Sequence, residues 1–111
     1  MISILCPSRG RPALAKKMID SAISTAVSPV EIILYINDDD PYLSEYQQLI
    51  DSKYYIVGPD RSPAYSWNRL AEICQGDILF LMGDDATFGT SGWDQMVETE
   101  FAKIPARIAC V

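Results

Sequence analysis

The chain has 111 residues, no histidine and a formal net charge of -6, a length that suits one small domain and is too short for two. Without histidine, Ser-His-Asp and Cys-His catalysis and histidine-ligated metal sites are excluded. The acidic balance argues against a nucleic-acid backbone as partner, and an apolar fraction of 49% excludes a disordered chain.

Short apolar runs alternate along the chain with amphipathic segments. The apolar runs predict strands at residues 2–6, 30–36, 54–57, 77–82 and 107–111. Between them, apolar residues recur every three to four positions, which predicts helices beginning near Pro12, Tyr42, Pro63 and Trp93. This alternation predicts a three-layer α/β/α domain built around a mostly parallel sheet.

Capping residues and the spacing of apolar residues predict where the helices end and which of their faces are buried. Ser62-Pro63 predicts an N-cap and a first-turn proline, and Gly76 is predicted to cap the end of the same helix. Tyr42, Tyr46 and Leu49 fall on one face of the second helix. The first helix is predicted to bury one apolar stripe, formed by Leu14, Ala15, Met18, Ile19, Ala22 and Ile23.

The cysteines and the N-terminus bear on the compartment. Cys6, Cys74 and Cys110 are odd in number and widely spaced, which excludes a disulfide framework or a zinc site and predicts buried free thiols. A phosphatase-type thiolate loop at Cys6 would need an arginine where Pro12 stands. The chain has no basic signal region and no apolar run of transmembrane length, so we expect a cytoplasmic protein without a membrane segment.

Charged residues follow the first four predicted strands, and ligands of parallel sheets bind at these carboxyl ends. The acidic clusters there would repel each other unless a cation sat among them. A hard divalent cation prefers such oxygen ligands, and arginines bind anionic oxygens. Together they predict a metal–diphosphate ligand, although each aspartate alone could be a turn former or a helix cap. The segments are residues 7–12, 37–40, 58–62 and 83–85.

With these segments in place, the chain resembles family 2 glycosyltransferases of the GT-A fold. The matching segments are residues 2–10, 33–39, 67–71 and 76–85, of which the last resembles the family's Asp-Asp variant of the DXD motif and is the most specific. The resemblance covers essentially the whole of this chain. It corresponds only to the N-terminal, nucleotide-binding half of the family's members. It implies that residues 1–111 form a single Rossmann-like GT-A domain that binds a nucleotide sugar and is truncated at its C-terminus.

The resemblance also implies site residues, carried over position by position. Asp39, or Asp38 because the register is uncertain by one, would accept a hydrogen bond from a uracil-type base. Asp84 would face the ribose, and Asp85 would coordinate Mn²⁺ or Mg²⁺ at the diphosphate. The remaining nucleotide contacts would come from Pro7, Ser8, Arg9 and Arg61.

Two departures stand out: Ser8-Arg9 replaces a Tyr-Asn pair of many members, and Gly83 replaces the first aspartate of a strict DXD. The catalytic residues remain unknown, because the family's general base comes from its C-terminal half. We therefore expect inverting transfer from a nucleoside-diphosphate sugar, UDP-linked by default, to an unknown acceptor. The alternative is a non-catalytic nucleotide-sugar-binding module or fragment.

Two further hypotheses rank lower. A metal-dependent phosphotransfer domain comes last, because Cys6-Pro7-Ser8 stands where such domains carry their key aspartate. A structural role without a ligand also stays open. The oligomeric state stays open, and the edge formed by the predicted strand at 107–111 is a candidate pairing site for a second copy in a homo-oligomer.

Overall fold

The computed structural model describes residues 1–102 and the backbone of 108–110, and in these residues the predicted alternation of strands and helices is confirmed. Of the predicted last strand, Arg107 and Val111 lie outside the described residues. The elements are β1 (Ile2–Ser8), α1 (Pro12–Thr25), β2 (Glu31–Asn37), α2 (Leu43–Leu49), a 3₁₀ turn (Ser52–Tyr54), β3 (Tyr55–Gly58), α3 (Pro63–Ile73), β4 (Ile78–Leu81), α4 (Trp93–Phe101) and β5 (Ile108–Cys110).

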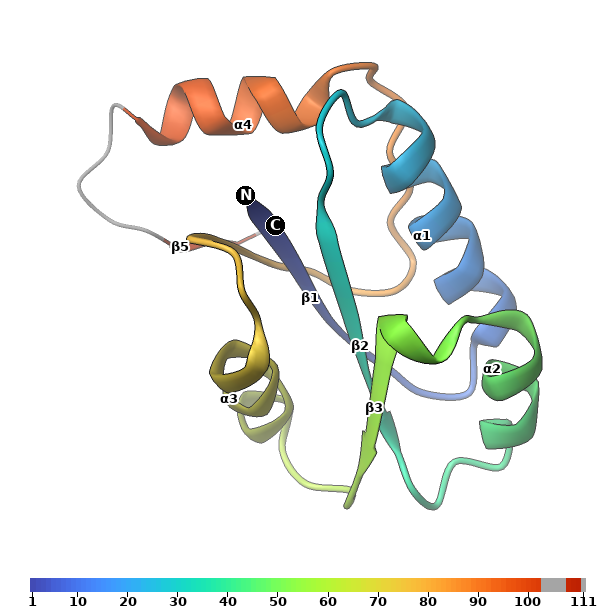
Figure 1. Ribbon diagram of the computed structural model, residues 1–111. Helices are drawn as coiled ribbons and strands as arrows, with labels where there is room; N and C mark the ends of the chain where they lie inside the picture. The colour runs from blue at the N-terminus through green and yellow to red at the C-terminus, as the bar shows by residue number, and fades with distance from the viewer. Residues whose placement is uncertain (103–107, 111) are drawn as a thin grey trace.

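The described strands form one sheet in the order β3-β2-β1-β4-β5, and all neighbours are parallel. Side chains alternate between the two faces of each strand. Ile2, Ile4 and Cys6 of β1 pack in a core with α1, α2 and α4, whereas Leu5 packs in a second core with α3. Figure 1 shows α1 and α2 on the opposite side of the sheet from α3, which confirms the three-layer α/β/α architecture.

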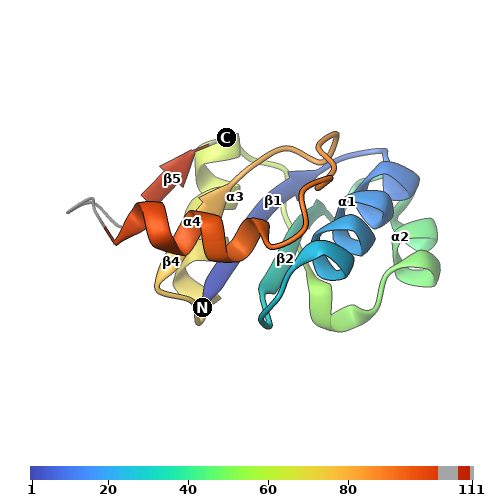
Figure 2. The ribbon, with the colours of Figure 1, turned by 90° about the horizontal axis from the view of Figure 1, so that it is seen from above.

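Seen from above, β5 and α4 lie toward one end of the molecule and α1 and α2 toward the other (Figure 2). The longest helix, α1, has 14 residues, whereas a membrane span needs about 20. Within the described part of the chain, no helix is long and apolar enough to cross a membrane.

The predicted buried faces of the helices are too wide. On α1, Ala15, Met18, Ile19 and Ala22 are buried, but Leu14 and Ile23 are 42% and 44% exposed. A single helix lying on a sheet covers only a narrow stripe, and these two residues flank it. On α2 only Tyr46 is buried, whereas Tyr42, which precedes the helix, and Leu49 at its end are exposed.

The prediction of Gly76 as a helix cap is wrong. The helix α3 ends at Ile73, and its cap residue Cys74 has an extended conformation. A side chain at Gly76 would place its Cβ 2.7 Å from the Met1 carbonyl oxygen and 2.9 Å from the Ser3 nitrogen. Glycine is therefore needed here so that the chain can pass close to the start of β1.

The predicted N-cap of α3 is confirmed, since the Ser62 hydroxyl accepts a hydrogen bond from the Tyr65 N–H at 3.2 Å. Replacing Ser62 with alanine is expected to lower the free energy of unfolding by about 1 kcal/mol, because this N–H loses its partner. Urea unfolding at pH 7, followed by circular dichroism, measures the loss. The exposed Ser91 is the control, and Ser91→Ala is expected to stay within about 0.5 kcal/mol of the native chain. Equal losses in both variants would contradict the cap.

Candidate functional site

The strand order reverses at β1, which lies between β2 and β4. Such a reversal is where open parallel sheets bind ligands, outside the carboxyl ends of the strands. Here the Ser8 hydroxyl at the end of β1 donates a 2.7 Å hydrogen bond to Asp84 Oδ2, just after β4. Two of the predicted site residues, 76 positions apart in the sequence, are thus joined at the switch point.

A pocket of about 230 Å³ lies at this edge, around the ends of β1 and β2, the loop after β3 and the first turn of α3. In Figure 1 it belongs to the lower part of the molecule, where β2 and β3 end and α3 begins. Four of the predicted nucleotide-binding residues line it, namely Pro7, Ser8, Arg9 and Arg61. Asn37 and Asp60 also line it; they belong to the predicted strand-end segments but were assigned no individual role. The remaining lining residues are Tyr35, Pro63 and Ser66.

Arg9 is held at the pocket by two carboxylates. Its Nη1 lies 2.9 Å from Asp39 Oδ1 and 3.8 Å from Asp60 Oδ2. The hydrogen bond with Asp39 raises the pKa of Arg9, and the same contact lowers the pKa of Asp39. Asn37 Nδ2 also donates to Asp60 Oδ1 at 3.2 Å, which ties the end of β2 to the loop after β3.

The second arginine of the pocket is held differently. The Arg61 guanidinium lies over the Tyr65 ring, 5.3 Å from its centre, a cation–π arrangement. Two arginine residues, Arg9 and Arg61, line one pocket. Guanidinium groups bind the oxygens of phosphates and carboxylates.

The three consecutive aspartates after β2 occupy different environments. Asp40 is buried, and its carboxylate accepts hydrogen bonds of 2.8 Å from the N–H groups of Gly10 and Tyr42. Gly10 has a φ of 66°, a left-handed conformation that favours glycine. Asp38 and Asp39 are exposed and do not line the pocket, although Asp39 touches it through Arg9.

The two aspartates after β4 also differ. Asp84 is buried, and its Oδ1 lies 3.5 Å from Arg11 Nη1. Asp85 is exposed. No three carboxylate or thiol side chains among the described residues are grouped so that they could hold a metal ion by themselves. A magnesium-type ion on a nucleotide takes one or two carboxylates, with phosphates and water completing the shell. Asp85, which does not line the pocket, would supply one such carboxylate.

Cys6 is buried in β1, two residues before Ser8, and its thiol is unreactive. Burial, with the charges of Asp84 and Asp85, raises the pKa of the Cys6 thiol to about 12. The thiol is therefore protonated at neutral pH and cannot act as a phosphatase-type nucleophile. The prediction of free thiols is confirmed for Cys6, which is buried, and for Cys74, which is partly buried.

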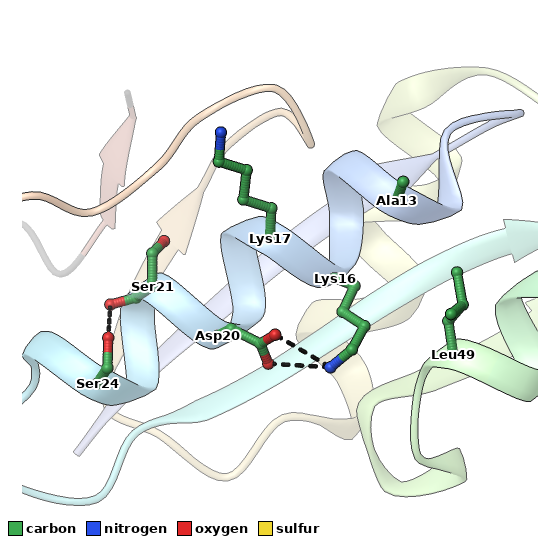
Figure 3. A pocket seen from close by; sticks show the side chains of 7 residues that line it. All are labelled: Ala13, Lys16, Lys17, Asp20, Ser21, Ser24 and Leu49. Carbon is green, nitrogen blue, oxygen red and sulfur yellow. Dashed lines mark hydrogen bonds and ion pairs between the residues drawn. The ribbon is translucent and has the colours of Figure 1, made fainter.

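A larger hollow of about 560 Å³ lies on the outer side of α1. Figure 3 shows Lys16 turned toward Asp20, Lys17 pointing away from that pair, and Leu49 reaching in from α2. Lys16 Nζ lies 3.0 Å from Asp20 Oδ2. None of the predicted site residues lines this hollow.

Two residues of the pocket and one behind it were assigned no site role from the sequence, and the strand-end rule could have found only the first two. Asn37 ends β2, and Asp60 directly precedes Arg61, so the rule that ligands bind at strand ends applies to both. Tyr46 contacts Ser8 through its hydroxyl at 2.6 Å. Nothing in the sequence indicates this contact, because the helical pattern predicts only that Tyr46 is buried.

No family model and no curated protein matches the sequence. Among solved structures, the fold is similar to that of S. aureus TarS 1–349, a glycosyltransferase, with a TM-score of 0.63 and 10% sequence identity. The match covers 92% of this chain and 32% of the TarS chain, so this chain spans about a third of that length. The chain therefore has a glycosyltransferase-like, Rossmann-like α/β fold.

Proposed function

We propose that this chain is the donor-binding domain of a glycosyltransferase, which binds a nucleoside-diphosphate sugar for transfer to an acceptor. The observation that carries the proposal is the pocket with two arginines, Arg9 and Arg61, beside the Ser8–Asp84 hydrogen bond at the switch point of a glycosyltransferase-like fold. Membership of family 2, inversion at the sugar and a UDP-linked donor belong to the proposal through the sequence resemblance.

In this proposal Pro7, Ser8, Arg9 and Arg61 surround the nucleotide. Their place in the lining of one pocket supports this role. Asp39 or Asp38 accepts a hydrogen bond from the base, and Asp39 already lies against Arg9 of the pocket. The half-buried amide of Asn37 and the exposed carboxylate of Asp60 offer further hydrogen bonds within the same pocket.

Two kinds of group would offset the negative charge of the diphosphate. Arginine guanidinium groups supply fixed positive charge near the leaving group. Asp85 would hold Mn²⁺ or Mg²⁺, which when bound offsets the negative charge that develops on the diphosphate. Asp84 faces the ribose, and its buried carboxylate already accepts a hydrogen bond from Ser8.

A second candidate is a non-catalytic nucleotide-sugar-binding module. It stays a candidate because no residue of this sequence was matched to the family's general base. In either case we propose an unidentified acceptor as partner, a cytoplasmic location in keeping with the free thiols of Cys6 and Cys74, and β5 as a pairing edge for a second copy.

Calorimetric titration with UDP, with and without Mn²⁺, tests the proposal. Asp85→Ala is expected to weaken UDP binding about tenfold when Mn²⁺ is present, the factor that corresponds to about 1.4 kcal/mol. Without Mn²⁺ the variant is expected to bind like the native chain. The matched control is Asp20→Ala, which removes an exposed carboxylate from the outer side of α1 (Figure 3) and is expected to leave both affinities unchanged.

Failure of the native chain to bind UDP, GDP, CDP, ADP or dTDP, with or without metal, would overturn the donor-binding role. Mn²⁺-dependent binding that survives in Asp85→Ala would remove Asp85 as the metal ligand. Release of UDP from UDP-glucose by this chain alone would favour the enzyme over the binding module.

A further inference from the structure

We propose that Tyr46 is a positioning residue, which acts through Ser8 to fix the orientation of the Asp84 carboxylate at the candidate site. This inference rests on the proposed function only for its effect on ligand binding. Tyr46 belongs to α2 and is not among the residues that line the pocket. Its influence on the site would therefore be transmitted by hydrogen bonds.

Three hydrogen bonds connect the groups in series. The Arg11 N–H donates to the Tyr46 hydroxyl at 3.0 Å, the Tyr46 and Ser8 hydroxyls lie 2.6 Å apart, and Ser8 Oγ donates to Asp84 Oδ2 at 2.7 Å. Because Ser8 has a single proton and gives it to Asp84, Tyr46 must be the donor in the middle bond. Every bond in the series then has one defined direction.

The bonds from Tyr46 to Ser8 and from Ser8 to Asp84 are buried, whereas the bond from the Arg11 N–H is partly buried. Tyr46 is 0% exposed, Ser8 5% and Asp84 7%. Burial raises the pKa of Tyr46, which keeps its phenol protonated and able to donate at neutral pH. In such surroundings an unpaired hydroxyl or amide is costly, so alternative orientations of Ser8 and Asp84 are disfavoured while the phenol is present.

Arg11 closes the series into a ring. Its backbone N–H binds the Tyr46 hydroxyl, and its guanidinium Nη1 lies 3.5 Å from Asp84 Oδ1. The two carboxylate oxygens of Asp84 therefore have different partners. Oδ2 accepts a hydrogen bond from Ser8, and Oδ1 lies toward the Arg11 guanidinium. Removing the Tyr46 hydroxyl would leave Ser8 with Asp84 as its remaining side-chain partner, so the orientations of Ser8 and of the Asp84 carboxylate would be less constrained.

The experiment removes single links in the series. Tyr46→Phe keeps the ring and deletes the hydroxyl, and it is expected to weaken UDP binding about five- to tenfold, the effect of losing one well-made hydrogen bond. Ser8→Ala breaks the next link without changing the packing of α2. In the Ser8→Ala background, Tyr46→Phe is expected to have no further effect, because its path to Asp84 is already broken.

A ligand-free measurement tests the same series independently. In ¹³C NMR spectra, the side-chain carboxyl resonance of Asp84 is expected to move in Tyr46→Phe and in Ser8→Ala. Exchange of the Arg11 amide proton is expected to accelerate in Tyr46→Phe, which loses the acceptor. Tyr55→Phe is the matched control, since Tyr55 is partly buried against the same core. In this variant the Asp84 carboxyl resonance is expected to stay in place.

The outcomes separate this inference from the proposed function. An unchanged Asp84 resonance in folded Tyr46→Phe would overturn the positioning role, as would additive losses of affinity in the double variant. If the native chain fails to bind UDP, the proposed function falls, and the Asp84 resonance alone decides whether Tyr46 positions this carboxylate.

Discussion

Replacing Asp94 with alanine is expected to lower the free energy of unfolding at pH 7 by about 3 kcal/mol, since two hydrogen bonds to a charged acceptor are lost. The Asp94 side chain is 1% exposed. Its two oxygens accept hydrogen bonds of 2.9 Å from the N–H groups of Val27 and Ser28. It therefore joins the segment after α1 to the first turn of α4, and alanine would leave both N–H groups without this acceptor.

The loss is expected to depend on pH. Burial by itself would raise the pKa of Asp94, but hydrogen bonds from backbone N–H groups, including those of Val27 and Ser28, outweigh it and lower the pKa. A carboxylate with a lower pKa in the folded than in the unfolded chain stabilises the fold above the unfolded value of about 3.9. This contribution is lost as the pH falls through the folded pKa.

Urea unfolding of the native chain and of Asp94→Ala at pH 7 and in acid measures the effect. The difference between them is expected to shrink as the pH falls below the unfolded pKa of Asp94. Asp94→Asn is the matched control, because its amide keeps one carbonyl acceptor but no titratable group. It is expected to lose about half as much stability as alanine, by the usual worth of a retained hydrogen bond. A difference of constant size at all pH values would contradict the role of the charge.

The layers of the fold were predictable because they follow from periodicity. In β1 and β2, apolar residues occupy both faces, as expected of strands covered by helices on each side. The helices repeat apolar residues at helical spacing. The rule that ligands bind at the carboxyl ends of strands then directed attention to Pro7, Ser8, Arg9 and Arg61, which the structure brings to one pocket.

The individual roles of similar residues were not predictable. Asp38, Asp39 and Asp40 are chemically identical neighbours, and the sequence offers no means of ranking them. Their environments are decided by the loop after β1, where the Gly10 N–H reaches Asp40 and the Arg9 guanidinium reaches Asp39. Contacts between loops 30 residues apart depend on backbone geometry that periodicity does not describe.

The buried Asp40 and the exposed Asp38 should therefore contribute very differently to stability. Asp40→Ala is expected to lower the free energy of unfolding by about 2–3 kcal/mol, because a buried carboxylate that accepts two backbone N–H bonds is lost. Asp38→Ala, its matched control two positions away, removes an exposed side chain and is expected to change stability by less than about 0.5 kcal/mol. Urea unfolding at pH 7 measures both variants.

The loss at Asp40 should also reach the candidate site. Gly10 stands between Arg9, which lines the pocket, and Arg11, which approaches Asp84. Releasing the Gly10 N–H from Asp40 frees the loop that carries both guanidinium groups, so folded Asp40→Ala is expected to bind UDP about tenfold more weakly, the factor given by 1.4 kcal/mol. Calorimetry at a temperature where the variant stays folded measures this. Native affinity in folded Asp40→Ala would show that Asp40 stabilises the fold without holding the arginines in place for the ligand.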